Sequence, residues 1–243
     1  MIILLTGCIN PKGMAFTTLS DQEERKAQYI NAIQYYLSNT SSKIVFSENS
    51  GTDISSLFKD AIESGRMEYL SFHGNQDKTR GKGYGECEII EYALDNSKLI
   101  HSSKDQRIAK ITGRLIVRNI KGILRWHKLL FSKQTVFCTI NSDLSFPDSR
   151  LIVAPVSFYK AFLHSKELIN DSKGYYFEHA LCETLKREND YSYSPFLFMP
   201  CIEGVSGSTG EIYFGKMGDF IFNLRYVKYT LSLQHKFKKL YRK

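Results

Sequence analysis

The stretch KIVFSENSG, from Lys43 to Gly51, is a short apolar run that stops at a group of polar residues. Its length and apolar content predict a buried strand, and Glu48-Asn49-Ser50-Gly51 predicts the turn that follows. A similar run, Ile2–Thr6, precedes it, and MEYLSFHGN follows it as a third predicted strand. Segments with helical spacing of apolar residues separate these strands. This alternation indicates a mostly parallel sheet with helices on both faces.

Helix signals support the alternation. Ser20 and Glu23 form a capping box before the first helix, and Asp53 caps the second. Farther along, we predict strands at RIAKITGR, TVFCTI, LIVAPV and PFLFMPCI, and helices over 115–130, 158–168 and 175–186. We therefore expect one α/β domain over residues 1–219, followed by a basic C-terminal helix over residues 220–243.

The composition is that of a folded soluble protein, with 243 residues of which 42% are hydrophobic and 24% charged. No apolar run approaches the ~18 residues of a membrane-spanning helix, and the N-terminus has no basic flank typical of a secretory signal. The five cysteines form no CxxC pair, which favours reduced thiols in a cytosolic protein. The six histidines are dispersed, so no metal cluster can be found locally.

The formal net charge of +8 is concentrated at one end of the chain. Residues 220–243 contain seven Lys or Arg and no acid, which leaves 26 basic and 25 acidic residues, or about +1, in the rest. A nucleic-acid-binding protein would be expected to spread its basic residues over the body as well. We therefore expect no nucleic-acid partner.

The basic segment also has apolar residues at spacings of three and four. They are Phe222, Tyr226, Tyr229, Leu233 and Phe237. This pattern is compatible with an amphipathic helix lying on an anionic membrane. A solvated helix, a disordered end and an RNA-binding tail are the alternatives.

Polar residues follow the predicted strands where ligands bind in open α/β sheets, beyond the carboxyl ends. Asn10 follows the first strand, Glu48 and Asn49 the second, and Thr112 and Arg114 the fourth. The alternative is that turns simply favour small polar residues. Their recurrence at one predicted edge favours a binding site.

GKGYGE, from Gly81 to Glu86, precedes a predicted helix but matches neither a dinucleotide fingerprint nor a Walker loop. Its glycines would let backbone N–H groups approach an anion, the helix N-terminus would add positive partial charge, and Lys82 a full charge. A mobile glycine turn with a solvated lysine is the alternative.

Three further motifs contain candidates for chemistry. Lys110 lies between apolar neighbours in KITGR, where a buried lysine needs a partner or an anion; a lysine on an edge strand is the alternative. Asp148 and Arg150 of DSR form either a cation site with a single carboxylate or a local ion pair in a turn. Glu178, in YFEHAL, is a candidate general base because partial burial raises the pKa of a carboxylate; it is alternatively an acid favoured in the first turn of a helix.

Together these motifs resemble bacterial glycosyltransferases encoded with O-antigen, capsule and other surface-polysaccharide genes. ILLTGCINP, IVFSENSG, EYLSFHGN, GKGYGECEIIEYAL, KITGRLIV, DSR and YFEHAL occur in the order associated with that group and extend over most of the chain. The order of elements is also similar to the nucleotide-sugar-binding half of GT-A folds. No DXD motif is present where that comparison expects one; Lys110, Thr112 and Arg114 occupy the position.

The resemblance implies a hexosyl transfer from a nucleotide sugar, with a UDP-sugar favoured, to a lipid-linked glycan at the inner face of the cell membrane. The resemblance does not fix the stereochemical course; our hypothesis is in-line attack with Glu178 as general base, which would give inversion. Donor contacts are expected from Asn10, Glu48, Asn49, Gly81, Lys82, Gly83, Tyr84, Gly85, Lys110, Thr112 and Arg114, and acceptor or diphosphate contacts from Asp148, Arg150 and His179. Cationic side chains would neutralise the diphosphate, or Asp148 would hold Mn²⁺ or Mg²⁺. A non-catalytic nucleotide- or glycan-binding protein is the alternative function.

Overall fold

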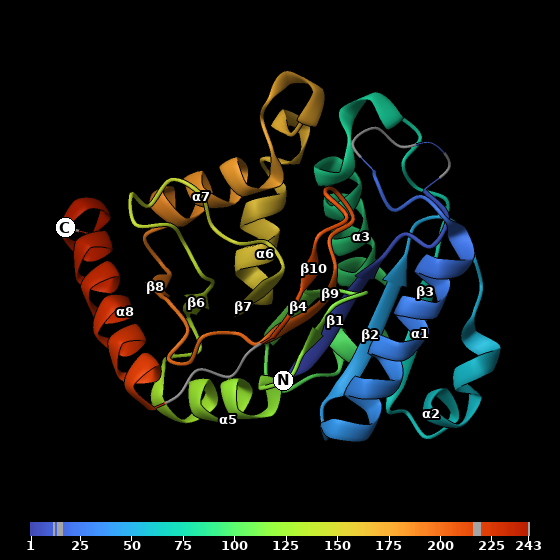
Figure 1. Cartoon of the computed structure of the whole chain (residues 1–243), viewed down its shortest axis with the longest axis horizontal. Coiled ribbons are helices and arrows are strands. Elements are labelled where there is room, and N and C mark those ends of the chain that lie inside the picture. Colours follow the sequence, from blue (N-terminus) through green and yellow to red (C-terminus); the bar gives the residue numbers. More distant parts are fainter. Residues whose placement is uncertain (12, 14–16, 216–219, 243) are drawn as a thin grey trace.

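The computed structural model of the chain describes residues 1–11, 13, 17–215 and 220–242. Its centre is a seven-stranded sheet with the order β3-β2-β1-β4-β7-β6-β8 (Figure 1). The strands are β1 (Ile2–Gly7), β2 (Lys43–Glu48), β3 (Met67–Ser71), β4 (Arg107–Thr112), β6 (Thr135–Phe137), β7 (Leu151–Pro155) and β8 (Ser192–Ser194). β7 runs antiparallel to β4 and β6, whereas the other four pairs are parallel. The predicted α/β class and mostly parallel sheet are confirmed.

Helices cover both faces of this sheet. One face packs against α1 (Gln22–Asn39), α2 (Lys59–Glu63) with η1 (Ser55–Phe58), and α5 (Ile120–Leu130). The other packs against α3 (Lys82–Asn96), α4 (Lys98–His101), α6 (Val156–Leu163) and α7 (Phe177–Arg187). Three short 3-10 helices connect these elements: η2 (Lys78–Arg80), η3 (Lys166–Leu168) and η4 (Asp171–Lys173).

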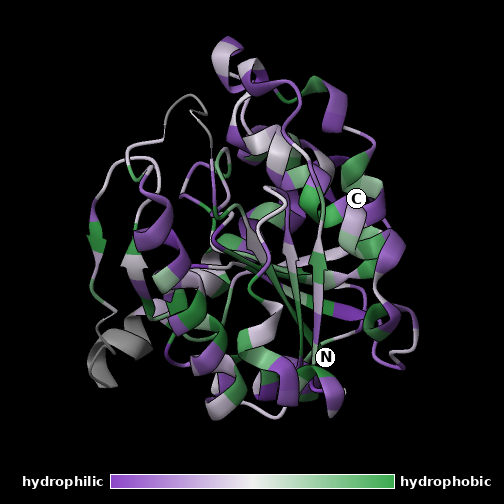
Figure 2. Cartoon of the chain, turned by 90° about the vertical axis from the view of Figure 1, so that its right-hand side faces the viewer, coloured by the Kyte–Doolittle hydropathy of each residue, from purple (hydrophilic) through white to green (hydrophobic). Residues whose placement is uncertain are grey.

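The alternation of side chains along each strand divides the interior into two apolar clusters. Ile2 and Leu4 of β1 contribute to the cluster under α3, whereas Ile3 and Leu5 contribute to the cluster under α1. Successive side chains of a strand point to opposite faces, so a sheet buried on both sides is apolar along its whole length. Figure 2 shows these apolar strands in the interior, with more hydrophilic residues on the surrounding helices and loops.

A small second sheet differs from the sequence prediction. β5 (Ile116–Val117), β9 (Ile202–Val205) and β10 (Ile212–Tyr213) form an antiparallel sheet in the order β10-β9-β5. The helix predicted over 115–130 therefore begins only at Ile120, because residues 116–117 pair with β9. The strand predicted at PFLFMPCI is also wrong, since residues 195–201 lie between β8 and β9 without strand structure.

Other helix starts also differ from their predicted positions. Asp53 does not cap the second helix, because η1 has Ile54 as its cap and no side-chain cap hydrogen bond. Asp21, and not Ser20, caps α1, since its carboxylate accepts a hydrogen bond from the Glu24 N–H. GKGYGE is not a loop before a helix, because α3 begins at Lys82 and only Gly81 precedes it as the cap, with φ of 87°.

The C-terminal helix α8 (Phe220–Tyr241) packs against the body beside β8 (Figure 1). Leu233 and Phe237 are buried in the core, and the Phe237 ring lies 4.7 Å from that of Tyr193. These two residues of the predicted membrane-facing stripe thus contact the protein itself; the side chain of Phe222 lies outside the described residues. Among the described residues, no helix combines the length and apolar character needed to cross a bilayer.

Candidate functional site

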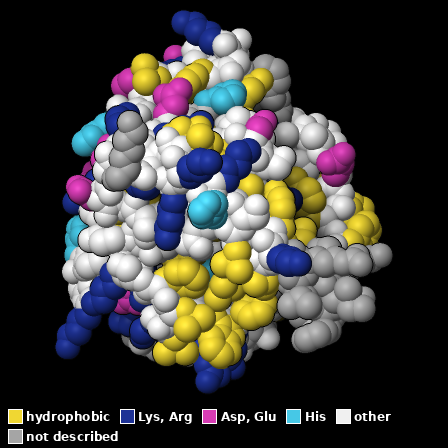
Figure 3. Space-filling view, turned by 90° about the vertical axis from the view of Figure 1, so that its left-hand side faces the viewer, with side chains coloured by type: hydrophobic (Ala, Val, Ile, Leu, Met, Phe, Trp, Pro, Cys, Tyr) yellow, Lys and Arg dark blue, Asp and Glu magenta, His cyan; other side chains and the backbone are white. Residues whose placement is uncertain are grey.

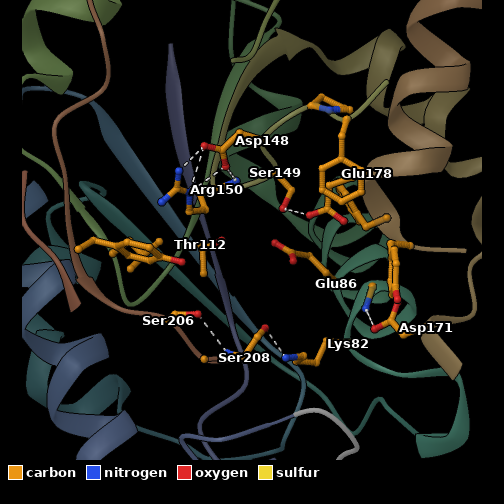
Figure 4. Close-up of a pocket in the computed structure, with 18 of the residues that line it drawn as sticks. Lys82, Glu86, Thr112, Asp148, Ser149, Arg150, Asp171, Glu178, Ser206 and Ser208 are labelled. Carbon is orange, nitrogen blue, oxygen red and sulfur yellow. Dashed lines mark hydrogen bonds and ion pairs between the residues drawn. The ribbon is translucent and has the colours of Figure 1, made fainter. Parts of the chain in front are cut away.

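A cleft of about 1130 Å³ opens at the edge of the sheet where the parallel strands end (Figure 4). Its walls come from the start of α3, the end of β4, the connection between β6 and β7, the start of α7, and the β9–β10 hairpin. A smaller pocket of about 110 Å³ continues from it between the ends of β1, β2 and β4. This is where strand order reverses around β1, the position at which open α/β sheets bind ligands.

The antiparallel direction of β7 brings Asp148, Ser149 and Arg150 to the same edge. Because β7 begins where its neighbours end, the residues before Leu151 lie next to Thr112. All three line the cleft. The sequence named Asp148 and Arg150 as site candidates in a loop between two strands, but did not name Ser149.

Lys110 is fully buried in the middle of β4, a central strand, so the alternative of an edge-strand lysine is wrong. Its ammonium forms an ion pair with Glu86 of α3 and donates a hydrogen bond to the Ser149 carbonyl oxygen at 2.7 Å. Thr6 donates to the same Glu86 carboxylate at 3.1 Å. Lys110 therefore has an internal carboxylate partner, and the group that reaches the cleft is Glu86.

Glu178 lies at the start of α7 and lines the cleft (Figure 4). The Ser149 hydroxyl donates a hydrogen bond of 2.6 Å to its Oε1 atom. Burial raises the pKa of Glu178, and the nearby Glu86 charge adds to the rise, while the Ser149 hydrogen bond and Lys110 oppose it. Ser149 thus connects Lys110, through its carbonyl, to Glu178, through its hydroxyl.

Asp148 and Arg150 form a local two-point ion pair. Arg150 Nη2 lies 2.6 Å from Asp148 Oδ2, and Arg150 Nε donates to Asp148 Oδ1 at 2.9 Å. The Asp148 carboxylate raises the pKa of Arg150, whose guanidinium also lies over the Tyr213 ring at 4.6 Å. This geometry agrees with the second interpretation of DSR, a local ion pair in a turn. Within the described ranges, no group of three His, Cys, Asp or Glu is placed to hold a metal ion.

The glycines of GKGYGE bring other side chains close to α3. A Cβ on Gly85 would come within 1.9 Å of Asn75 Oδ1, and one on Gly81 within 2.5 Å of Asp171. The Gly83 N–H donates to Asp171 at 3.1 Å, so a carboxylate of the chain already occupies the start of this helix. Burial raises the pKa of Asp171, and the two backbone N–H groups at the helix start oppose that rise.

Three cations surround the smaller pocket: Arg25, Lys82 and Arg114. Arg25 and Arg114 are buried, and burial lowers the pKa of Lys82, with Asp171 acting in the opposite direction. Lys82 donates to Ser208 at 2.5 Å, and Arg114 to the Val205 carbonyl at 2.9 Å, which ties both to the β9–β10 hairpin. Arg25 was not among the residues predicted from the sequence, because there it is only one of several charged residues on a helix.

Two buried polar atoms at this pocket have no hydrogen-bond partner in the described part of the chain. They are Asn49 Oδ1, an acceptor, and Arg114 Nε, a donor. Asn49 is 1% exposed and lines the pocket, as does Arg114. Buried polar groups are nearly always paired, so unsatisfied ones beside a pocket indicate a ligand.

The remaining predicted residues divide into two groups. Thr112 and Gly83 line the cleft, and Gly85 lines the smaller pocket. Neither pocket is lined by Asn10, Glu48, Gly81, Tyr84, Lys110 or His179. Glu48 is fully buried and accepts hydrogen bonds from the backbone N–H groups of Ile9, Ser50 and Thr52.

Tyr84 and His179 likewise make contacts outside the cleft. The Arg80 guanidinium lies 3.9 Å from the centre of the Tyr84 ring. His179 Nδ1 accepts a hydrogen bond from the Tyr176 N–H and caps α7. Both side chains thus lie outside the cleft and the smaller pocket.

No protein-family model matches the sequence, and no curated protein is similar to it. Among solved structures, the galactosyltransferase LgtC in complex with donor and acceptor sugar analogs is similar at 10% identity and a TM-score of 0.46, over 82% of this chain and 74% of that one. The glycosyltransferase GlyE of Streptococcus pneumoniae TIGR4 has 9% identity and a TM-score of 0.46, over 79% and 44%. A cytidylyltransferase from Leptospira borgpetersenii serovar Hardjo-bovis has 8% identity and a TM-score of 0.47, over 96% and 95%. No site residue is assigned from these similarities.

Proposed function

We propose that this chain is a nucleotide-sugar-dependent glycosyltransferase with a GT-A-like fold. The observation that carries the proposal is the cation group Arg25, Lys82 and Arg114, which lies beside a large cleft lined by a half-buried carboxylate, Glu178. A nucleoside diphosphate is the leaving group of such a reaction, and fixed cations stabilise the charge that develops on it. The motif order over most of the chain supports the same class.

The donor would bind with its nucleoside toward the smaller pocket and its diphosphate between Lys82 and Arg114. The unsatisfied Asn49 Oδ1 would accept a hydrogen bond from the base or ribose, and Arg114 Nε would donate to the diphosphate. Glu48 and Asn10 act indirectly, because Glu48 and Ser50 hold the backbone that carries Ile9 and Asn10. A UDP-sugar remains the favoured donor.

Transfer would proceed by direct attack of an acceptor hydroxyl on the anomeric carbon. Glu178 takes the hydroxyl proton as the new C–O bond forms, and the bond to the nucleoside diphosphate breaks with its electron pair on the phosphate oxygen. Lys82 and Arg114 stabilise that oxygen charge. Ser149 is a positioning residue, because its hydroxyl fixes Glu178 Oε1. A single displacement inverts the anomeric centre.

The residues at the cleft do not fit a divalent cation. Mg²⁺ on a diphosphate is usually held by one or two carboxylates, and Asp148 is bound at two points by Arg150. Position 112 is Thr and position 114 Arg, so no acid follows β4. We propose that cationic side chains replace the metal, and no step here is assigned to Mn²⁺ or Mg²⁺.

The wall of the cleft opposite the donor end would bind the acceptor. Phe146 and Tyr176 line it and are each 41% exposed, which provides aromatic surface for a sugar ring. A lipid-linked glycan of a bacterial surface polysaccharide, such as O-antigen or capsule, is the acceptor that the motifs favour.

Donor hydrolysis tests the function without knowledge of the acceptor. Purified protein would be incubated with a panel of UDP- and GDP-sugars, with and without EDTA, and release of the nucleoside diphosphate measured. We expect hydrolysis of one donor, unaffected by EDTA. Hydrolysis of none, with no thermal stabilisation by any nucleotide, would contradict the proposal. Stabilisation without hydrolysis or transfer would select the non-catalytic binding protein.

A further inference from the structure

Helix α5 carries three apolar side chains that the protein leaves in solvent. Trp126 is 43% exposed, Leu129 65% and Leu130 59%. At 100° per residue they lie within about 100° of arc on the outer side of the helix. Single exposed apolar residues are common on protein surfaces, whereas three adjacent ones form a patch that indicates an interaction. Hydrophobic side chains gather with Lys and Arg beside them on the side of the molecule where α8 lies (Figure 3).

The fold does not need these side chains for packing. The opposite side of α5 supplies Ile120, Ile123, Leu124 and His127, all buried in the core. The helix is therefore anchored by one stripe, and the outer apolar side chains are each at least 43% exposed.

Cations lie along the other flank of the same exposed arc. Lys121, Arg125 and Lys128 are spaced by four and three residues, are exposed, and form no ion pair with another described residue. The surrounding sequence is uniformly basic, with eight Lys or Arg and no Asp or Glu from Gln106 to Ser142. We define the α5 surface as these three cations together with Trp126, Leu129 and Leu130.

We propose that the α5 surface binds an anionic lipid bilayer. Trp126, Leu129 and Leu130 would enter the interface between headgroups and acyl chains, where tryptophan and leucine are favoured. Lys121, Arg125 and Lys128 would lie over anionic headgroups. Each charge would raise the affinity for the membrane about fivefold. A protein partner fits less well, because the centres of protein interfaces are depleted of lysine. Nucleic acid would use the cations but not the adjacent leucines.

The α5 surface differs from the surface expected from the sequence. The C-terminal helix was expected to place its apolar stripe on a membrane; Leu233 and Phe237 of that stripe are buried in the protein, whereas Tyr229 is 43% exposed. The exposed lysines of α8, such as Lys228 and Lys239, add positive charge, while α5 supplies the apolar contact.

Trp126 is the only tryptophan of the chain, so its fluorescence reports on this surface alone. The full chain would be titrated with vesicles of phosphatidylcholine, with or without phosphatidylglycerol, and binding confirmed by co-sedimentation. We expect a shift of emission to shorter wavelength and co-sedimentation with the anionic vesicles only, both weakened by added salt.

Two variants that keep Trp126 separate the apolar and ionic contributions. Leu129→Ser/Leu130→Ser should weaken binding at least about tenfold. Lys121→Gln/Arg125→Gln/Lys128→Gln should weaken it about a hundredfold. Leu57→Ser is the matched control, since Leu57 is 56% exposed on η1, away from α5, and should leave binding unchanged.

Absence of an emission shift with anionic vesicles would overturn the proposal, as would equal losses in the Leu57 and Leu129/Leu130 variants. A shift that follows protein concentration without vesicles would assign the surface to a second copy of the chain. No nucleotide enters these measurements, so their outcome is independent of the glycosyltransferase proposal.

Discussion

The charged residues of the cleft and those of α5 are of the same types but in opposite situations. Lys110 is fully buried and bound by Glu86 and the Ser149 carbonyl, whereas Lys128 is exposed and has no ion pair with a described residue. A buried charge is stable only with its partners, while an exposed one interacts mainly through the summed field of its neighbours. Single substitutions should therefore have large effects in the cleft and small ones on α5.

The largest effect is expected from Lys110→Met. Removal of the ammonium leaves Glu86 without its partner at a largely buried position, which should lower the free energy of unfolding by about 3 kcal/mol. For a chain of this length that is a fall in Tm of about 6–12 °C. Calorimetry measures it, with Lys104→Met at an exposed position as control. Equal Tm values would mean that the buried pair is not needed for stability.

Glu178→Gln should abolish transfer while the fold stays intact. Loss of a general base lowers kcat by about 10²–10⁴-fold. Burial raises the pKa of Glu178, so the neutral amide should be at least as stable as the acid at neutral pH. Single-turnover kinetics and calorimetry measure the two effects. Wild-type turnover would remove Glu178 from the mechanism.

The raised pKa of Glu178 also predicts two pH dependences. Activity should fall about tenfold per pH unit below that pKa, with a midpoint above the ordinary glutamate value of about 4.3. Because the folded-state pKa is raised, the stability that protonated Glu178 contributes is lost as the pH rises through that value. The wild type should therefore lose stability relative to Glu178→Gln over this range. A parallel pH profile of unfolding for the two proteins would contradict the raised pKa.

Lys82→Gln is expected to have an intermediate effect. A charge-assisted contact to the diphosphate contributes about 1.5 kcal/mol, so the Kd for the donor should rise about tenfold with little change in Tm. Isothermal titration with the hydrolysed donor's nucleoside diphosphate measures this, and Lys43→Gln, at the exposed start of β2, is the control. If both variants bind equally well, Lys82 does not contact the diphosphate.

The smallest effect is expected from Lys121→Gln. This exposed side chain should change the free energy of unfolding by no more than about 0.5 kcal/mol and leave donor binding unchanged. Chemical denaturation and the same titration test it. A fall in the free energy of unfolding close to that of Lys110→Met would contradict the difference expected between the cleft and α5.

The sheet was predictable because its signal is local. Ile2–Gly7 and Lys43–Glu48 are buried along their whole length, and continuous apolar runs indicate such strands without reference to the rest of the chain. The direction of β7 was not predictable, because periodicity is the same for either direction. The place of Arg150 beside Thr112 follows from that direction and was missed for the same reason.

The site was predictable in part. Lys110 was expected to contact the donor diphosphate, or else to lie on an edge strand; the structure buries it in the central sheet with an internal carboxylate partner. Its partner Glu86 lies on another element, and no sequence spacing connects them. Asp171 occupies the start of α3 from a 3-10 turn more than 80 residues away, so GKGYGE alone could not reveal that its helix N-terminus already contacts a carboxylate.

The position of Lys110 in the sheet has a consequence for how the chain folds. It pairs with Leu4 of β1 and Ile152 of β7, in the middle of the strands that form the centre of the sheet. A charge there is costly until α3 brings Glu86 and the turn before β7 brings Ser149. We therefore expect the central strands to be stable only together with α3 and β7. The core and the floor of the cleft should then be lost in one cooperative unfolding transition.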